Sequence, residues 1–347
     1  MDLSALNKIA SKMVETGKGI LAADESSGTI KKRFDQINLE STENARRDYR
    51  EMLFRAEGMK HISGVILYDE TIWQKAADGT PLVKLIEKSG AIPGIKVDEG
   101  TEVIAGTSGE LITKGLDNLS ARLPKYYEAG ARFAKWRAVI DPVAGRFSHT
   151  GIMANAHALA RYANLCQANN IVPIVEPEVL MDGDNDIDAC YQVTQWVLKE
   201  TFQQLYFMNV ALEGIVLKPN MIVPGKKSAK KAGIAEIAEK TIKCLKNCVP
   251  AAVPGIAFLS GGQSDEEATA NLSAMNALQT RGDDLFPWPW NLTFSYGRAL
   301  QHATIMAWAG KPENVKRAQT VFTHRAKMNG LATKGAYKPE MERELAA

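Results

Sequence analysis

The chain has 347 residues, of which 45% are hydrophobic and 24% are charged, and its formal net charge at pH 7 is +2. This length suits one large barrel or two ordinary domains, and the composition is typical of globular proteins. The small net charge excludes a global electrostatic attraction to nucleic acid or to membranes, and no apolar run reaches the length of a membrane span.

Residues 1–19 predict a helix and not a targeting segment. Apolar residues recur there at helical spacing and mark one face: Leu3, Leu6, Ala10, Met13 and Val14. Gly17 follows as a stop signal for the helix. A secretory signal would need a basic start and a continuous apolar core, so we expect a cytoplasmic protein.

Eight apolar runs then follow one another, and each ends in polar residues and is followed by a helix-like segment. They are residues 17–26, 62–70, 91–100, 131–140, 171–180, 212–220, 254–264 and 290–299. Eight strands alternating with helices predict an α/β fold, the (β/α)₈ TIM barrel. The rival, a doubly wound open sheet, favours a glycine-rich phosphate loop after the first strand. This chain has AADESSG there, which matches neither the dinucleotide nor the P-loop pattern.

Charged residues gather where the predicted strands end, and barrels of this kind have their active sites at those ends. The ends carry Asp24, Asp69, Lys96, Asp98, Lys135, Arg137, Glu176, Glu178 and Lys218. Residues two apart on a strand share a face, so we expect these groups to converge on one pocket. Mutual ion pairing explains one such pair. It explains less well why most strands end this way, because buried ion pairs contribute little net stability.

Lys218 closes the apolar run 215–217 at the end of the sixth strand. A lone lysine in such a place usually extends its ammonium into water. A free lysine amine, in contrast, attacks carbonyl carbons and forms a Schiff base. A neighbouring cation such as Lys135, together with an apolar wall, favours the free amine. The candidates for the accompanying proton transfers are Glu176, Glu178 and Asp24.

Phosphate recognition has candidates after the seventh and eighth strands, where barrels of this kind commonly bind phosphate. The segment LSGGQS offers the Ser260 hydroxyl and the backbone N–H groups of Gly261 and Gly262, before a helix whose N-terminus favours an anion. That helix begins with Ser264 three residues before Glu267, a capping-box spacing. The segment SYGR, from Ser295, adds Gly297 and the guanidinium of Arg298.

A metal-dependent mechanism is not favoured. The five histidines form no metal-binding spacing. The segment DGDNDID (residues 182–188) resembles the start of a calcium loop, but Ile187 stands where that loop needs glycine and Val193 where it needs glutamate. We therefore expect this segment to cap a helix. Cys244 and Cys248 share a helix face, but no second pair completes a metal site, which favours buried structural thiols over metal ligands. The lysine-rich run 225–231 suits a solvated loop better than a docking site for an acidic partner.

Six segments together resemble class I fructose-bisphosphate aldolases: ILAADES, KWR, VEPE, LKPNM, LSGGQS and SYGRALQ. Their order and spacing match the family from about Leu3 to Tyr337. The resemblance implies a cytoplasmic (β/α)₈ homotetramer of glycolysis and gluconeogenesis. Such an enzyme cleaves fructose 1,6-bisphosphate reversibly to dihydroxyacetone phosphate and glyceraldehyde 3-phosphate, through a lysine Schiff base and without a metal.

The resemblance also implies roles for single residues. Lys218 falls on the Schiff-base lysine, Glu176 on the main proton-transfer group and Glu178 on its acidic neighbour. Asp24 falls on the aspartate that assists carbon–carbon cleavage, and Lys135 on the lysine that steers carbinolamine chemistry. The cradle for the phosphate at carbon 1 comprises Ser260, Gly261, Gly262, Gly297 and Arg298, and Ser295 is a further substrate-binding residue. The rest of the sugar and the second phosphate fall to Ser26, Lys32, Arg33, Lys96 and Arg137.

The C-terminus departs from the family pattern. Many members end in a tyrosine on a mobile tail, which assists proton transfer to the enamine. This chain ends GAYKPEMERELAA, and its last tyrosine is Tyr337. We therefore divide the chain into a barrel domain, residues 1–337, and a tail, residues 338–347. Enamine protonation is expected to be slower here or to use another group.

Two alternatives remain beside the aldolase hypothesis. One is another Schiff-base barrel enzyme, a transaldolase-like or deoxyribose-phosphate aldolase-like protein, which needs only one strong phosphate site where this chain offers basic groups for two. The other is a non-catalytic scaffold on the same fold. An inactivated descendant would be expected to have lost one of four key residues, yet all are present: Lys218, Glu176, Asp24 and Lys135.

Overall fold

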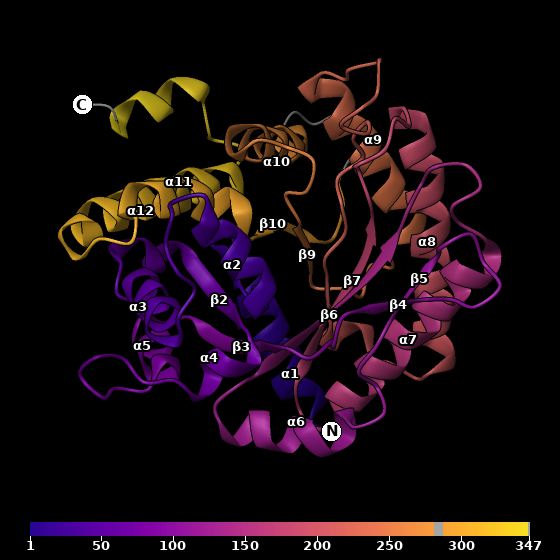
Figure 1. Ribbon diagram of the computed structural model, residues 1–347. Coiled ribbons are helices and arrows are strands. Elements are labelled where there is room, and N and C mark those ends of the chain that lie inside the picture. Colours follow the sequence, from indigo (N-terminus) through magenta and orange to yellow (C-terminus); the bar gives the residue numbers. More distant parts are fainter. Residues whose placement is uncertain (281–286, 346–347) are drawn as a thin grey trace.

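The computed structural model describes residues 1–280 and 287–345, and within them eight parallel strands close into a barrel surrounded by helices (Figure 1). Each strand lies inside the run that predicted it, so the (β/α)₈ prediction is confirmed. Around the barrel the order is β1 (Gly19–Ala23), β10 (Asn291–Tyr296), β9 (Gly255–Phe258), β8 (Val216–Leu217), β7 (Val172–Val179), β6 (Phe133–Ile140), β3 (Ile92–Lys96) and β2 (Ile62–Leu67).

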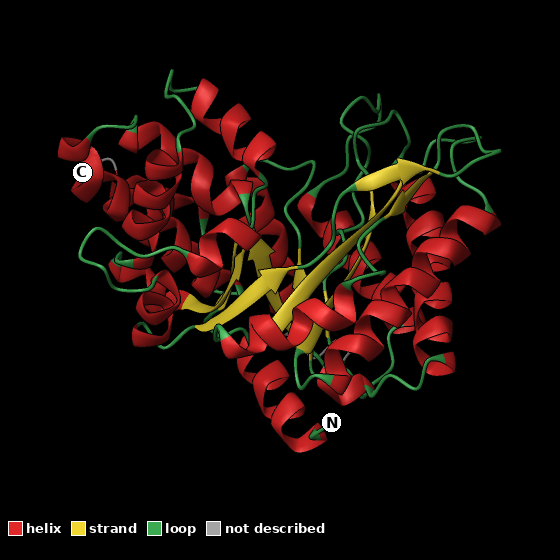
Figure 2. Cartoon of the chain, turned by 60° about the horizontal axis from the view of Figure 1, so that its bottom comes forward, coloured by secondary structure: helices red, strands yellow, loops and turns green. Residues whose placement is uncertain are grey.

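Helices cover the outside of the barrel, as the cartoon coloured by secondary structure shows (Figure 2). The α-helices are α1 (Leu3–Met13), α2 (Ser27–Asp35), α3 (Glu43–Phe54), α4 (Asp69–Trp73), α5 (Leu82–Lys88), α6 (Leu119–Glu128), α7 (His149–Ala168), α8 (Ile187–Phe207), α9 (Ile234–Cys248), α10 (Asp265–Thr280), α11 (Arg298–Trp308) and α12 (Val315–Ala332). Short 3₁₀ helices are η1 (Glu57–His61), η2 (Leu212–Gly214), η3 (Pro312–Asn314) and η4 (Pro339–Leu345).

The helix α1 packs against the apolar layer inside the barrel, at the end where the strands begin. Its residues Leu6, Ala10 and Met13 join one buried cluster with inward-facing strand residues such as Phe133 and Val216. The predicted apolar face is therefore correct except at Leu3, which is 38% exposed because it lies in the first turn, beyond this cluster. The helix also ends at Met13, before Gly17, whose φ of +91° belongs to a later turn.

Side chains alternate between the two sides of each strand, so the charged residues follow the inward-facing apolar residues on the same side. On β6, Lys135 lies two residues after the inward-facing Phe133 and shares its side. On β7, Glu176 lies two residues after the inward-facing Ile174 and shares its side in the same way. Arg137 lies opposite Glu176 in the parallel register of these two strands. The barrel interior thus changes from apolar to charged along the strand direction, and the charged layer lies toward the carboxyl ends.

Two features of the fold were absent from the prediction. An antiparallel hairpin, β4 (Thr101–Val103) with β5 (Leu111–Thr113), follows β3. Its strands have three residues each and β4 is exposed along its length, so it leaves no apolar run in the sequence. The segment η4 follows α12, where Glu342 pairs with Arg325 and, at 2.7 Å, with His324.

The predicted helix starts are confirmed. The Ser264 backbone N–H donates to the Glu267 carboxylate at 2.7 Å, and the Glu267 N–H donates to the Ser264 hydroxyl at 3.1 Å, which is the reciprocal bonding of a capping box. In the DGDNDID segment, Asp186 caps α8 by accepting from the Ala189 N–H at 3.0 Å. No helix among the residues described combines the length and apolar character needed to cross a bilayer.

Candidate active site

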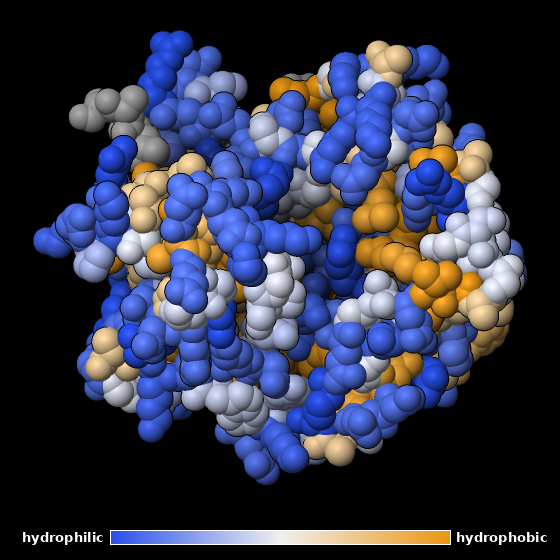
Figure 3. All heavy atoms as spheres, in the orientation of Figure 1, coloured by the Kyte–Doolittle hydropathy of each residue, from blue (hydrophilic) through white to orange (hydrophobic). Residues whose placement is uncertain are grey.

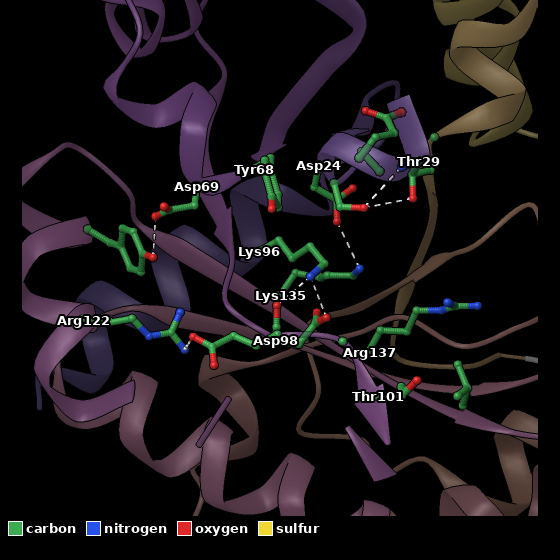
Figure 4. A pocket seen from close by; sticks show the side chains of 18 of the residues that line it. Asp24, Thr29, Tyr68, Asp69, Lys96, Asp98, Thr101, Arg122, Lys135 and Arg137 are labelled. Atoms are coloured by element: carbon green, nitrogen blue, oxygen red, sulfur yellow. Dashed lines mark hydrogen bonds and ion pairs between the residues drawn. The ribbon is translucent and has the colours of Figure 1, made fainter. Parts of the chain in front are cut away.

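A cavity of about 740 Å³ opens at the carboxyl ends of β1, β3 and β6. Figure 3 shows a hollow near the centre of the face viewed, with hydrophilic residues inside it. In the close-up of the cavity, Asp24, Lys96 and Lys135 point toward one another from three different strand ends (Figure 4). The predicted convergence of charged strand ends is therefore what the fold produces.

A buried carboxylate lies between two lysines at the centre of the site. Glu176 Oε1 is 3.1 Å from Lys218 Nζ, and its Oε2 is 3.3 Å from Lys135 Nζ. Lys135 also contacts Asp24 Oδ2 at 3.1 Å. Lys218, Lys135 and Glu176 are each at most 5% exposed. Two lysines and two acidic side chains are thus packed together with little access to water.

The charge states of this group follow from its geometry. Burial alone would raise the pKa of Asp24, but Lys135 and Lys218 outweigh burial and bring that pKa down to about 2. Burial lowers the pKa of Lys135, and Asp24 and Glu176 more than offset it, so that this pKa lies above its ordinary value. At neutral pH Asp24 is a carboxylate and Lys135 is an ammonium.

Two further ion pairs border the centre: Lys96 with Asp98, whose spacing predicted that they share a side, and Arg137 with Glu178, which joins the neighbouring strands β6 and β7. The Nε of Arg137 donates to Glu178 Oε2. The Lys96 ammonium lies 2.7 Å from Asp98 Oδ1 and also donates to the Asp98 carbonyl oxygen. Arg137 and Lys96 line the main cavity, so cations are available there to a bound anion.

In the loop after β9, position 262 has a backbone and a packing environment that suit only glycine. Gly262 has a φ of +78°, and a Cβ there would lie 2.2 Å from the Met181 side chain. The Ser295 hydroxyl is buried and has no hydrogen-bond partner among the residues that the structure describes. Arg298 pairs with Asp265 at 2.9 Å and donates to the carbonyl oxygen of Gln263. The guanidinium of Arg298 is therefore held beside the loop of Ser260, Gly261 and Gly262.

The predicted residues of α2 form a second basic group. Ser26 caps α2 by accepting from the Thr29 N–H, and Arg33 lines the main cavity. Lys32, Arg33 and Arg298 also line a smaller cavity of about 200 Å³ together with His302. The structure thus brings Arg298, assigned with the carbon 1 phosphate, beside the cations expected at the second phosphate.

Several cavity residues escaped the sequence reasoning. Glu25 and Thr29 lie in the AADESSGT segment beside predicted residues, so proximity was a signal that pointed to them. Arg122 and Tyr126 come from α6, and nothing in their sequence marks them. Tyr126 donates to Asp69 Oδ1 at 2.7 Å, which joins α6 to the wall formed by the residues after β2.

The remaining sequence predictions concern metals and the lysine run. Among residues 1–280 and 287–345 no three metal-binding side chains lie close enough to hold an ion. Cys244 is buried and Cys248 half-buried on α9. The lysine run is exposed at Lys226 and Lys230, which pair with Asp182 at 2.7 Å and Asp186 at 3.3 Å, as fits a solvated loop.

Comparison with known proteins gives consistent matches along the chain. Residues 5–347 match the family model described as "Fructose-bisphosphate aldolase class-I". The chain is 56% identical to "Fructose-bisphosphate aldolase 6, cytosolic" of Arabidopsis thaliana, over 93% of this chain and 88% of that protein. It is 52% identical to "Probable fructose-bisphosphate aldolase class 1" of Xanthomonas campestris, over 97% and 100%.

A solved structure also matches along nearly the whole chain. It is a fructose-bisphosphate aldolase from Plasmodium falciparum, in complex with TRAP and a small-molecule inhibitor. The TM-score is 0.93, the sequence identity is 49%, and the alignment covers 97% of this chain and 96% of that one.

The depressed pKa of Asp24 predicts a pH-dependent contribution to stability. A carboxyl whose pKa falls from 3.8 to about 2 on folding stabilises the protein above pH 4, and this contribution is lost as the pH falls toward 2. Compared with an Asp24→Asn variant, the wild type should lose about 1 kcal/mol of unfolding free energy between pH 5 and pH 3. Denaturant titrations at each pH measure the difference, and a constant difference would contradict the assignment.

Proposed function

The chain belongs to the class I fructose-bisphosphate aldolase family, whose glycolytic reaction is the reversible cleavage of fructose 1,6-bisphosphate, and we propose that Lys218 carries this reaction as a Schiff base. The supporting observation is the shared carboxylate: Glu176 touches Lys218 and Lys135 together. The family works without a metal ion, which agrees with the chemistry of these groups.

Schiff-base formation uses Lys218, Glu176 and Lys135. The free amine of Lys218 attacks carbon 2 of the open-chain sugar; its nitrogen loses one proton and the former carbonyl oxygen gains one, which gives a carbinolamine. That hydroxyl then takes a second proton and leaves as water. Glu176, 3.1 Å from Lys218 Nζ, passes these protons, and the ammonium of Lys135 stabilises the negative charge that develops on oxygen.

Cleavage of the bond between carbons 3 and 4 follows from the Schiff base. Asp24, ionised at neutral pH, accepts the proton of the hydroxyl on carbon 4. The new carbonyl of glyceraldehyde 3-phosphate forms as the electrons of the broken bond move to the protonated Schiff base, which becomes an enamine. Carbon 3 of the enamine then takes a proton, and hydrolysis releases dihydroxyacetone phosphate and the amine of Lys218.

The two basic groups hold the phosphates at the ends of the substrate. Ser260, Gly261, Gly262, Ser295, Gly297 and Arg298 bind the phosphate on carbon 1, and Ser26, Lys32, Arg33, Lys96 and Arg137 bind the remainder of the sugar and the second phosphate. Arg137 is in turn held by Glu178. Binding energy gained at the phosphates positions carbons 2 to 4 at the lysine–carboxylate centre. This use of two basic groups favours a bisphosphate aldolase over a transaldolase-like enzyme.

The Tyr337 side chain is packed against the protein and is not presented to the enamine. The Tyr337 side chain is 8% exposed, and its burial, together with the neighbouring Glu342, raises the pKa of its hydroxyl well above the ordinary value. Glu342 is in turn anchored on Arg325 and His324. We therefore assign the enamine proton to Glu176, and the division into a barrel of residues 1–337 and a tail of residues 338–347 stays a prediction.

We assign the protein to the cytoplasm, because its Arabidopsis relative is described as cytosolic. We also assign it a homotetramer. An exposed aromatic pair supports a subunit interface: Tyr206 and Phe207, at the end of α8, are 77% and 58% exposed and lie against each other.

Trapping the Schiff base tests the central assignment. Borohydride reduction with dihydroxyacetone phosphate should leave one covalent adduct, and peptide mapping by mass spectrometry should place it on Lys218. Lys218→Met should abolish the adduct and lower kcat by at least about 10⁴-fold, since the nucleophile is lost. Lys226→Met, on the exposed loop, is the matched control and should change neither. An adduct elsewhere, or activity abolished by EDTA, would contradict the mechanism.

Truncation after Tyr337 tests the role of the tail. We expect kcat to stay within about threefold, because no tail residue is assigned to the chemistry. Stability should fall by about 1–3 kcal/mol, because Arg325 and His324 lose Glu342. Glu342→Gln should reproduce most of this destabilisation at full length. A tenfold or larger loss of kcat in a folded truncation would show that the tail takes part in catalysis.

Disruption of the α8 surface tests the assembly. Analytical ultracentrifugation of the wild type should give the mass of four chains. The double variant Tyr206→Asp, Phe207→Asp should give smaller species, because it puts charge into an apolar interface. Met306→Asp changes an apolar residue of α11 that is 46% exposed and should leave the tetramer intact. A monomeric wild type would refute the tetramer, and a tetrameric double variant would show that the interface does not include Tyr206 and Phe207.

A further inference from the structure

Glu25 is a buried carboxylate beside the catalytic centre that the mechanism above does not use. It follows Asp24 directly, and neighbouring residues of an extended chain point to opposite sides. Asp24 faces Lys135, whereas Glu25 faces α2, α3 and α11, where its partners lie. Glu25 is only 7% exposed, yet it reaches the wall of the main cavity.

Three side chains from three helices hold the Glu25 carboxylate. Its Oε1 accepts hydrogen bonds from Arg33 Nη1 and, at 2.9 Å, from Gln301 Nε2, and its Oε2 accepts one from Arg50 Nη2 at 2.6 Å. Gln301 is itself fixed, because it donates to the Ala22 carbonyl at 2.7 Å and accepts from the Tyr49 hydroxyl at 3.0 Å. The carboxylate therefore has one position, set by the scaffold.

Arg33 is the partner that leads from this cluster into the substrate cavities. Among the residues described, Glu25 is the acceptor that the Arg33 guanidinium contacts. Its Nη2 lies 3.6 Å from the position that a Cβ on Gly297 would occupy. Arg33 lines both the large cavity and the small basic one. One end of the guanidinium is thus anchored. The other end faces the space between the residues assigned to the carbon 1 phosphate and those assigned to the second phosphate.

The charge balance of the cluster leaves a place for an anion. Arg50 is 2% exposed, and Glu25 is the carboxylate that neutralises it. Arg33 is a second cation on the same carboxylate, so the cluster carries one positive charge in excess. A purely structural ion pair would need only Arg50. The surplus cation faces the cavity, where it would attract a phosphate.

We propose that Glu25 is a positioning residue that holds Arg33 in place for the substrate phosphate remote from the Schiff base. The inference rests on the proposed role of Arg33 in phosphate binding. Glu25 itself does not touch the substrate in this assignment. Its clamp removes the rotational freedom of a long side chain before the substrate arrives, so that less entropy is lost on binding.

Comparing two substrates separates positioning from stability. Glu25→Gln keeps the shape of the side chain but removes the charge that holds Arg33. With fructose 1,6-bisphosphate its KM should rise about tenfold at nearly unchanged kcat. With fructose 1-phosphate, which lacks the remote phosphate, KM should change less than about twofold. Glu25→Asp, which keeps the buried charge, serves as a second variant if Glu25→Gln fails to fold, and it should show the same discrimination because its shorter side chain cannot hold both arginines.

The Arg33→Gln variant distinguishes failure of this inference from failure of the proposed function. If Glu25 acts through Arg33, the double variant Glu25→Gln, Arg33→Gln should have the same KM for fructose 1,6-bisphosphate as Arg33→Gln alone. Glu70→Gln, which breaks the partly buried Arg46–Glu70 pair outside the cavities, is the matched control and should leave both KM values unchanged. If Arg33→Gln discriminates between the substrates but the Glu25 variants do not, or if their effects add, the positioning role is refuted. If Arg33→Gln does not discriminate, the phosphate assignment of Arg33 itself is wrong.

Discussion

The site depends on one buried contact, the carboxyl group of Glu176 shared by the side-chain nitrogens of Lys135 and Lys218. Charges removed from water are costly unless partners surround them. With Asp24 on the far side of Lys135, two acidic side chains and two lysines lie within contact distance of one another. Such an arrangement contributes little to folding stability. It keeps proton donors and acceptors close to a nucleophile where a carbonyl carbon can enter, and catalysis is the benefit that offsets the desolvation.

The depth of this charged layer is set by the packing beneath it. The α1 helix and the inward-facing apolar residues, among them Phe133 and Val216, fill the barrel where its strands begin. A Cβ on Gly94 would lie 2.3 Å from the Phe133 ring, so the ring takes the space that a side chain of β3 would need. Because this lower layer is full, the next residues along the strands meet at the level where the cavity opens.

Two of the arginines assigned to phosphate binding come from helices and not from the barrel strands that supply Lys96 and Arg137. Arg33 comes from α2 and Arg298 begins α11, and each already has a protein carboxylate, Glu25 or Asp265. Guanidinium groups pre-oriented in this way bind phosphate without first losing their side-chain freedom. The energy gained at the ends of the substrate is then available to orient the reacting carbons, which connects the outer helices to the chemistry at Lys218.

The sequence by itself determined the barrel, the helix α1 and the chemistry of the strand ends, because strand alternation and helix capping are local patterns. The same patterns placed Lys135, Glu176 and Lys218 among the inward-facing groups. Only the tertiary structure decided which of these side chains contact one another. Glu176 is shared because barrel closure sets β6, β7 and β8 side by side, and Glu25 meets Arg50 and Gln301 because α3 and α11 pack beside the same strand end. Contacts between residues so distant in the chain follow from strand register and helix packing, which no short stretch of sequence contains.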